Sequence, residues 1–486
     1  MLIIQSPNHK SQIPKFNLLI LNKQFMPSKN NKAYVVAVDM GYGHRRAVFP
    51  LRDIAICPPY LRSQASRKRG NIIVANDYEK IPAEDKKIWD ASRELYEKIS
   101  RFKHVPIVGE IVWSVFDKFQ SIPSFYPRRD LSKPNLQLRE IMFLIEKKKW
   151  GKDLIDKLNR NPRPLITSFF AIAFMAEHFG YKEDIYCLIC DADISRTWVS
   201  QNPKKSKIKY FAPCYRVEER LKLYGVPPDN IFLTGFPLPK ENLGGSGLGV
   251  LKNDLWHRIY NLDPLKKYTS QYEQSICRHL KVKSLPKKTN HPLTLTFVVG
   301  GAGAQREIAM DILESLKAKI LDRKIKVILV AGSRKDVYKD FQKMIKQSSV
   351  SQEFKRNGFV EIIFKENKSE YFKKFNEILR KTDILWTKPS ELCFYTALGL
   401  PIIMAPAIGS QEEFNKLWLK AIGAGISQED PKHTDEWLFD WLNSGWLAEA
   451  AMQGYFEAFK FGTYNIEKII SHREEEIKEM KIIQIS

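Results

Sequence analysis

The feature that most constrains the fold of this 486-residue chain is a repeated alternation of short apolar runs with helical stretches. In the first half, the apolar and β-branched runs cover residues 33–38, 71–76, 164–169, 184–190, 207–213 and 231–238. Strands that are separated by helices pair in parallel and are joined by right-handed crossovers. The first half of the chain therefore predicts an α/β domain built on a parallel sheet.

A second series of strands follows a stretch rich in glycine, proline and basic residues, and a chain of this length predicts roughly two to four domains. The second series covers residues 293–299, 326–333, 360–366, 384–389 and 401–406. We predict an N-terminal extension at 1–32, α/β domains at 33–240 and 291–450, a linker at 241–290 and C-terminal helices at 451–486. Two Rossmann-like parallel-sheet domains that face a cleft form the architecture called GT-B.

The net charge of +23 is concentrated in the first part of the chain. Residues 1–290 hold 50 Lys and Arg against 28 Asp and Glu, a net charge of +22, whereas residues 291–486 hold 28 against 27, a net charge of +1. Such a one-sided positive field attracts a polyanion, either anionic lipid headgroups or nucleic acid. A lysine-rich surface that serves solubility is the alternative. Because no helix-turn-helix, zinc-finger or RNA-binding signature is recognised, we do not expect nucleic acid.

Residues 84–120 form an insert with the periodicity of amphipathic helices. Its apolar residues recur three to four positions apart on both sides of Pro106, and they include Trp113, Phe116 and Phe119. We expect these helices to dip into lipid headgroups, with packing against the sheet as the alternative. No apolar run reaches the ~20 residues of a membrane span, and the start of the chain lacks the charged region of a signal peptide. The sequence therefore predicts a cytoplasmic protein that associates peripherally with membranes.

A glycine-containing turn follows the first predicted strand of each domain. In the second domain the turn holds Gly300, Gly301 and Gly303, and backbone N–H groups at such a turn can approach a phosphate. A nicotinamide-dinucleotide domain would require an acidic residue after the next strand. Because that strand ends in Ala-Gly-Ser-Arg at 331–334, a dehydrogenase is excluded.

In the first domain the turn holds Gly41 and Gly43 and leads directly into His44. An imidazole at the carboxyl end of a strand faces the cleft, where its neutral ring can accept a proton. A structural histidine is the alternative. We predict His44 as a catalytic base.

Polar side chains also gather after the strand at 401–405, in a loop that contains Gln411, Glu412, Glu413 and Asn415. Ligands of doubly wound sheets bind outside the carboxyl ends of the strands. Carboxylates flanked by amides suit a ligand with many hydroxyl groups, such as a sugar. A surface loop with ordinary acidic residues is the alternative.

Two patterns have metal-like spacing, but neither predicts a metal. Asp191 and Asp193 resemble a metal-binding Asp-x-Asp pair, yet the phosphate-binding turn lies in the other domain, so we expect Asp191 to orient an acceptor or the His44 ring. Cys187 and Cys190 lie in an apolar run with no second pair at zinc spacing, so we expect buried strand thiols.

Together these motifs resemble the diacylglycerol glycosyltransferases, namely the monogalactosyldiacylglycerol synthases and the processive diacylglycerol glucosyltransferases. The resemblance covers most of residues 33–425. The helical region at 94–119, which contains Trp113, is similar to the region that this family associates with the lipid acceptor. The matched positions are Asp39, Gly41, Gly43, His44, Arg45, Asp191, Trp198, Gly235, Pro237, the Gly-rich loop, Thr387, Lys388, Pro389, Gln411, Glu412, Glu413 and Asn415.

The chain departs from the family pattern at five positions. Tyr42 stands where a glycine is usual, and Ser195 replaces a frequent histidine. Ser390 and Glu391 replace a Gly-Gly pair, and Thr396 takes the position of a glutamate that holds the nucleotide ribose. Glu391 is therefore a candidate to replace that glutamate.

The resemblance implies a metal-independent glycosyltransferase that uses a UDP-sugar and no cofactor. The donor would bind the second domain at Gly300, Gly301, Gly303, Lys388, Glu391, Gln411, Glu412, Glu413 and Asn415. His44, beside Asp191, would deprotonate a hydroxyl group of the acceptor, which the resemblance implies is a lipid. The acceptor side of the cleft would be formed by Gly41, Gly43, Arg45, Trp113 and Trp198. A nucleotide-sugar epimerase, or a non-catalytic GT-B-like protein that binds lipid or nucleic acid through its basic domain, are the alternatives.

Overall fold

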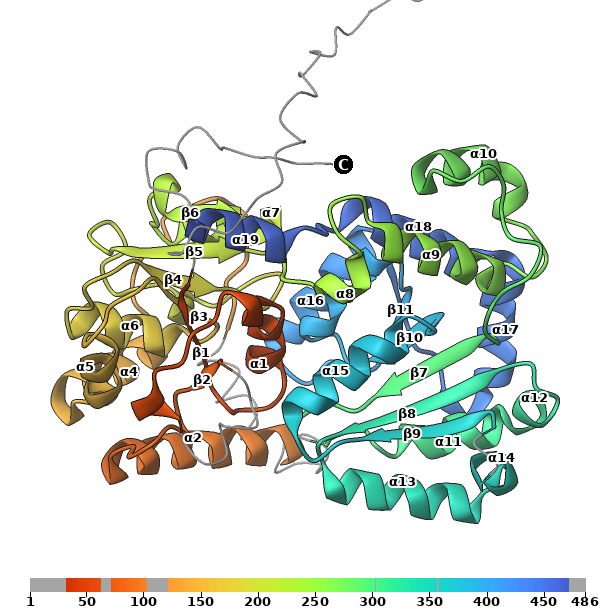
Figure 1. Cartoon of the computed structure of the whole chain (residues 1–486), viewed down its shortest axis with the longest axis horizontal. Helices are drawn as coiled ribbons and strands as arrows, with labels where there is room; N and C mark the ends of the chain where they lie inside the picture. The colour runs from red at the N-terminus through yellow and green to blue at the C-terminus, as the bar shows by residue number, and fades with distance from the viewer. Residues whose placement is uncertain (1–31, 63–70, 103–120, 302, 356–357, 472–486) are drawn as a thin grey trace, which may run out of the picture.

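The computed structural model describes residues 32–62, 71–102, 121–301, 303–355 and 358–471, and they form two α/β domains side by side (Figure 1). Each domain contains a six-stranded sheet, and every strand pairing in both sheets is parallel. The predicted GT-B class, two Rossmann-like domains facing a cleft, is confirmed.

The first sheet has the strand order β2-β1-β3-β4-β5-β6. Its strands are β1 (Tyr34–Ala37), β2 (Ile73–Val74), β3 (Leu165–Thr167), β4 (Ile185–Leu188), β5 (Ile208–Ala212) and β6 (Ile231–Leu233). Its helices are α1 (Gly43–Val48), α2 (Ala83–Phe102), α4 (Leu136–Lys148), α5 (Lys152–Leu158), α6 (Phe170–His178) and α7 (Tyr215–Leu223). The order reverses between β1 and β3, which makes their carboxyl ends the expected ligand-binding point of this sheet.

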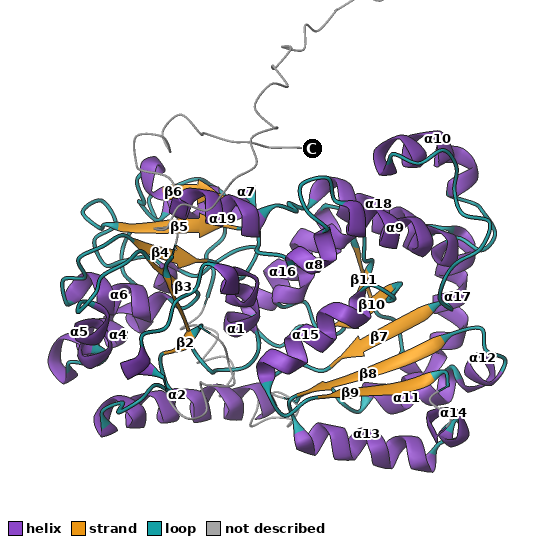
Figure 2. Ribbon diagram, viewed as in Figure 1, coloured by secondary structure: helices purple, strands orange, loops and turns teal. Residues whose placement is uncertain are grey.

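The second sheet has the order β12-β11-β10-β7-β8-β9 and reverses between β7 and β10. Its strands are β7 (Thr294–Val298), β8 (Lys326–Gly332), β9 (Val360–Phe364), β10 (Ile384–Thr387), β11 (Ile402–Met404) and β12 (Gly425–Ser427). Helices cover the sheet on its two faces (Figure 2). They are α11 (Ile308–Ser315), α12 (Lys317–Leu321), α13 (Lys335–Gln347), α14 (Ser351–Lys355), α15 (Lys368–Leu379), α16 (Ser410–Ala421), α17 (Thr434–Ser444) and α18 (Trp446–Glu457).

The predicted strands all form, and the buried strand residues are almost entirely apolar, as sheets covered by helices require. The sequence reading missed β12, a short edge strand whose three residues are only partly buried. The segment predicted as a linker is largely helical and contains α8 (Lys240–Leu243), α9 (Gly249–Leu262) and α10 (Thr269–Leu280). Of the predicted insert, α2 is described, whereas residues 103–120, with Trp113, Phe116 and Phe119, lie outside the described residues.

The last described helix, α19 (Gly462–Ser471), returns to the first domain and lies beside β6 and α7 in Figure 1. Thr463 Oγ1 donates to the carbonyl of Leu238 at 2.6 Å, and Asn465 Nδ2 donates to the carbonyl of Thr234 at 2.8 Å. Within the described part of the chain, no helix has the length and apolar character needed to cross a membrane.

We expect Gly454→Ala to lower the free energy of unfolding by about 1 to 3 kcal/mol, the usual effect of overpacking a core. Gly454 lies in α18, and a Cβ atom there would lie 2.6 Å from the backbone carbonyl oxygen of Thr396, so the helix would have to move. Gly247→Ala is the matched control, because a Cβ at Gly247 meets open space. Equal thermal unfolding midpoints for the two variants would contradict this packing.

Candidate active site

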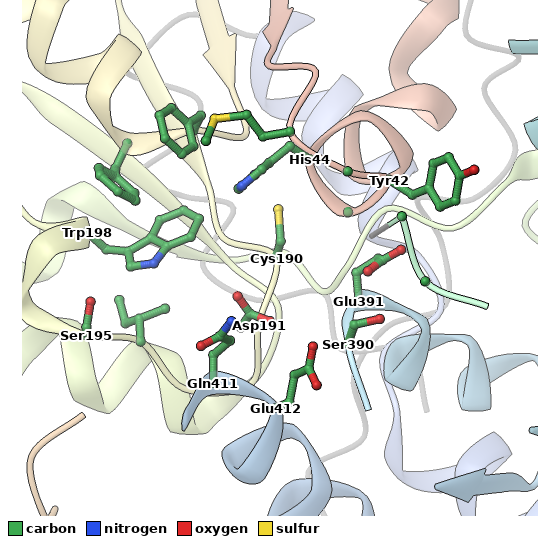
Figure 3. A pocket seen from close by; sticks show the side chains of 18 of the residues that line it. Tyr42, His44, Cys190, Asp191, Ser195, Trp198, Ser390, Glu391, Gln411 and Glu412 are labelled. Atoms are coloured by element: carbon green, nitrogen blue, oxygen red, sulfur yellow. The ribbon is translucent and has the colours of Figure 1, made fainter. Parts of the chain in front are cut away.

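A cavity of about 660 Å³ lies between the domains, at the carboxyl ends of the strands where both sheets reverse their order. The first domain contributes residues that follow β1, β3 and β4, and the second contributes residues that follow β7, β10 and β11 (Figure 3). The topology therefore brings together segments that are far apart in the sequence.

His44 projects from the first turn of α1 toward the middle of this cavity (Figure 3). Its Nδ1 lies 2.7 Å from the carbonyl oxygen of Ser168, and the Ser168 hydroxyl donates to the His44 carbonyl at 2.8 Å. A carbonyl oxygen can only accept, so Nδ1 carries the proton and the neutral ring presents a lone pair on Nε2. Burial lowers the pKa of His44, against the opposing effects of the Ser168 hydrogen bond and the Glu391 carboxylate. The ring is thus held neutral, in the form that accepts a proton.

Asp191 lines the same cavity and is connected to the second domain by Asn415. Asn415 Nδ2 donates to Asp191 Oδ1 at 2.9 Å and to the Pro389 carbonyl at 3.1 Å, while Asn415 Oδ1 accepts from the Ala192 amide at 2.7 Å. The pKa of Asp191 is raised to about 6, mainly by burial. The carboxylates of Glu391 and Glu412 also raise this pKa, whereas the Asn415 hydrogen bond and Lys388 lower it. The Asn415 side chain is therefore engaged in domain contacts, and it does not line the cavity.

Lys388 is the cation at the polar end of the cavity, where it pairs with Glu412. The other carboxylate oxygen of Glu412 accepts from the Ile408 amide at 2.8 Å. A Cβ on Gly300 would lie 2.7 Å from Lys388 Cε, so glycine at 300 leaves room for the lysine stem. The glycine turn, Lys388 and Glu412 form one packed unit.

Of the remaining predicted donor residues, Gly301 and Gln411 line the cavity, whereas Gly303 and Glu413 do not. Glu413 is exposed and lies 3.8 Å from Lys416 on the same helix. Glu413 lies in helix α16, which turns successive side chains to different sides, whereas Gly303 is buried beside Val337.

On the acceptor side, Gly41, Gly43 and Trp198 line the cavity, whereas Arg45 is buried with its guanidinium 3.8 Å from Asp39. The Trp198 ring lies 6.3 Å from the His44 ring, measured between centroids. Trp113 lies outside the described residues.

The sequence reading missed the apolar wall of the cavity. This wall runs from His44 and Trp198 toward α2 and α4, and its residues are Trp89, Ile122, Ile141, Leu144, Trp150, Phe169, Phe170 and Ile194. Their rings touch in succession, with centroids 4.5 Å apart for Trp89 and Trp150 and 5.0 Å apart for Phe169 and His44. These apolar residues come from separate segments of the chain. Nothing in the sequence indicates that they line one cavity.

The reading also missed two residues that carry interdomain contacts, Tyr42 and Arg46. The Tyr42 hydroxyl accepts from the Ser333 amide at 2.7 Å, and Arg46 forms a buried ion pair with Glu391 at 3.1 Å. Glu391, a predicted donor residue, thus lines the cavity with one carboxylate oxygen held by the first domain. The unusual tyrosine at a glycine position was the available signal.

Two further family departures have different surroundings. Ser195 is buried and lines the cavity near Trp198. Thr396 is fully buried in the 3-10 helix Glu391–Leu398 and faces α18, so it does not line the cavity.

The residues with metal-like spacing make other contacts or are buried. Asp193 accepts from Arg220 at 2.8 and 2.9 Å and from Arg216 at 2.9 Å. Cys187 and Cys190 are free, buried thiols, as predicted, and burial raises the pKa of each. No group of three or more His, Cys, Asp or Glu side chains in the described ranges is placed to hold a metal ion.

Comparison with known proteins gives matches over most of the chain. A family model described as a domain of unknown function (DUF6938) matches residues 274–465. The processive diacylglycerol β-glucosyltransferase of Bacillus subtilis (strain 168) is 22% identical over 352 residues, which are 69% of this chain and 78% of that protein. The enzyme of the same name from Bacillus pumilus (strain SAFR-032) is 20% identical over 405 residues, 82% of this chain and 83% of that protein.

Solved structures match at lower identity. The UDP-GlcNAc 2-epimerase from Neisseria meningitidis bound to UDP-GlcNAc is 15% identical with a TM-score of 0.42, covering 92% of this chain and 100% of that one. MurG from Acinetobacter baumannii is 12% identical with a TM-score of 0.40, covering 71% and 81%. The sequence similarity to the Bacillus enzymes, together with the two parallel-sheet domains, identifies the chain as a distant homologue of the processive diacylglycerol β-glucosyltransferases.

Proposed function

We propose that the protein is a glycosyltransferase that moves a sugar from a nucleoside diphosphate, most simply UDP, to a hydroxyl of an acceptor with an apolar part. The observation that carries this proposal is the fixed, neutral His44 between a polar wall from the second domain and an aromatic wall from the first. The distant homology to diacylglycerol glucosyltransferases supports the same reaction class. In this scheme residues 33–240 bind the acceptor and residues 291–450 bind the donor.

The proposed reaction is a single displacement. His44 Nε2 takes the proton of the acceptor hydroxyl, the acceptor oxygen forms a bond to the anomeric carbon, and the bond from that carbon to the diphosphate oxygen breaks. Lys388 and the backbone N–H groups at Gly300 and Gly301 balance the negative charge of the leaving diphosphate. Asp191 would orient the acceptor. None of these steps requires a metal ion.

The acceptor we propose is a lipid hydroxyl, and helix α4 connects the cavity to the surface. Ile141 and Leu144 line the cavity, while Leu136 and Phe143 on the same helix are 64% and 54% exposed. Leu136, Arg139, Phe143 and Lys147 are three or four residues apart and share an exposed helical face. An apolar and basic face of this kind suits the surface of an anionic membrane.

A nucleotide-sugar epimerase is the second candidate, and a specific observation favours it. Asp191, Glu391 and Glu412 place three carboxyl groups around the polar end of the cavity, and the pKa of Asp191 is raised to about 6. Carboxyl groups near a sugar ring can exchange protons with its carbon atoms or hydroxyl groups. Incubation with UDP-sugar alone distinguishes the two functions, since an epimerase converts the sugar without an acceptor and a transferase does not.

We expect Gln411→Ala to weaken binding of a UDP-sugar by about 5- to 10-fold while leaving binding of UDP unchanged. The expected loss corresponds to one or two hydrogen bonds to the sugar. Isothermal titration calorimetry measures both affinities. Glu413→Gln is the matched control, because Glu413 is exposed outside the cavity. Absence of binding of any common nucleoside diphosphate at millimolar concentration would refute the donor site.

We expect His44→Ala to lower turnover by roughly 10² to 10⁴, the usual contribution of a positioned base, with little change in donor affinity. Since burial lowers the pKa of His44, the parent should stay active below pH 6.5 and lose activity only as the pH falls through that lowered pKa. A pH profile of kcat/KM measures this loss of activity at acidic pH. His433→Ala is the control, because that side chain is 63% exposed, and equal turnover in His44→Ala and the parent would remove the base role.

We expect the double variant Leu136→Ser, Phe143→Ser to reduce the fraction of protein that sediments with vesicles containing anionic lipid. The loss should be largest at high salt, where the basic residues contribute least. Phe456→Ser is the control, since Phe456 is an exposed aromatic residue in the second domain. Equal sedimentation with neutral and anionic vesicles would contradict the proposed surface.

A further inference from the structure

Tyr42 and Arg46 lie on either side of His44 at the start of α1, and both side chains bind residues of the second domain. We propose that they are positioning residues. They keep the cleft closed without a bound ligand and thereby determine the position of His44 relative to the second domain. The role in catalysis rests on the proposed function, whereas the closure itself does not.

Tyr42 crosses the cleft and enters a slot in the second domain. Its hydroxyl lies 2.7 Å from the Ser333 amide, which donates to it, and 3.2 Å from Ser333 Oγ. Its ring centroid lies 5.1 Å from that of Tyr371 and 6.3 Å from that of Phe372, and the side chain is only 5% exposed. Gly332 leaves room for the hydroxyl, because a Cβ there would collide with it. The tyrosine therefore has a complete partner surface in the other domain.

Arg46 makes a second anchor one helical turn later. Its guanidinium donates to Glu391 Oε1 at 3.1 Å and to the Tyr371 hydroxyl at 2.7 Å, and lies 4.7 Å from the centroid of the Phe375 ring. The side chains of Arg46 and Glu391 are 3% and 9% exposed. Both charged groups are buried and find these partners across the cleft, so a small opening that does not admit water would leave a buried charge without its partner. The contact therefore favours the closed arrangement over a partly opened one.

Two departures from the family pattern meet in this contact. In the resemblance to the diacylglycerol glycosyltransferases, Tyr42 in the first domain and Glu391 in the second stand where that family usually has a glycine. Tyr42 forms the first anchor and Glu391 forms the ion pair of the second. Glycine at both positions would remove the first anchor and the ion pair, and would leave Arg46 with its contacts to Tyr371 and Phe375. The backbones also approach closely, since a Cβ on Gly301 would lie 2.7 Å from Gly41 Cα. Tyr42 and Glu391 thus both strengthen contacts between the two domains, and both oppose opening of the cleft.

The first test is hydrogen exchange of the Ser333 amide, measured by mass spectrometry on overlapping peptides. Tyr42→Phe removes the hydroxyl that accepts this N–H and keeps the ring, so exchange at Ser333 should become about fivefold faster. Tyr338→Phe is the control, because the Tyr338 hydroxyl accepts from Gln342 within the second domain. Unchanged exchange at Ser333 in Tyr42→Phe would overturn the anchor.

The second test is small-angle X-ray scattering with and without UDP. The parent should have the same radius of gyration in both conditions, whereas the double variant Tyr42→Gly, Glu391→Gly should have a larger radius without ligand. Arg380→Gln, which removes an ion pair with Asp254 inside the second domain, should leave the radius unchanged. Compaction of the parent on addition of UDP, or an unchanged radius in the double variant, would overturn closure without ligand.

Steady-state kinetics then distinguish a role of Tyr42 in placing His44 from an effect of Tyr42 on folding. Tyr42→Phe should lower kcat about tenfold with KM for the UDP-sugar nearly constant, because only the placement of His44 changes. Loss of activity in His44→Ala with normal exchange and scattering would support both proposals. Full activity in His44→Ala would refute the base role of His44, and absence of sugar transfer by the parent would refute the proposed function. In either case the exchange and scattering measurements would still decide the closure.

Discussion

The structure depends on the close approach of two glycine turns, one from each domain. A Cβ atom on Gly301 would lie 2.7 Å from Gly41 Cα, so the second turn can approach the first only without a side chain at this position. The side chains of Tyr42 and Arg46 extend from the start of α1 into the second domain. Each turn ends a strand at the point where its sheet reverses order. The cavity lies where these two points face each other, and its walls are formed by residues that follow these and neighbouring strands, together with residues of α2 and α4.

The cavity has two chemically different halves, and α1 lies between them. On the second-domain side, Lys388, Glu412 and Gln411 offer charge and hydrogen bonds. On the first-domain side, contacting aromatic rings offer apolar area. A ligand that fills both halves is amphipathic, and its polar and apolar parts meet near His44. This division agrees with transfer of a sugar to a hydroxyl on an apolar acceptor.

The sequence predicted the parallel sheets and the positions of His44 and Asp191 at the cleft, because strand ends in such sheets converge whatever the side chains are. It could not predict which side chains of a polar loop turn inward. Glu413 is exposed while its neighbour Glu412 is buried, and this difference follows from helix α16 beginning at Ser410. It also could not predict that Glu391 and Arg46, 345 positions apart, form a pair, since that contact depends on the relative placement of the two domains.

The return of α19 to the first domain fixes how the two domains can move. The chain crosses between them twice, near Gly235 and near Gly462, and these crossings touch: a Cβ on Gly235 would lie 2.6 Å from Phe459 Cβ, and one on Gly462 would lie 2.6 Å from the Gly235 carbonyl oxygen. Two crossings in contact act as a single hinge. Sliding of one domain over the other would stretch both crossings, so a relative movement of the domains is expected to pivot at this place. A pivot at this place could widen the cleft only by separating Tyr42 and Arg46 from their partners in the second domain.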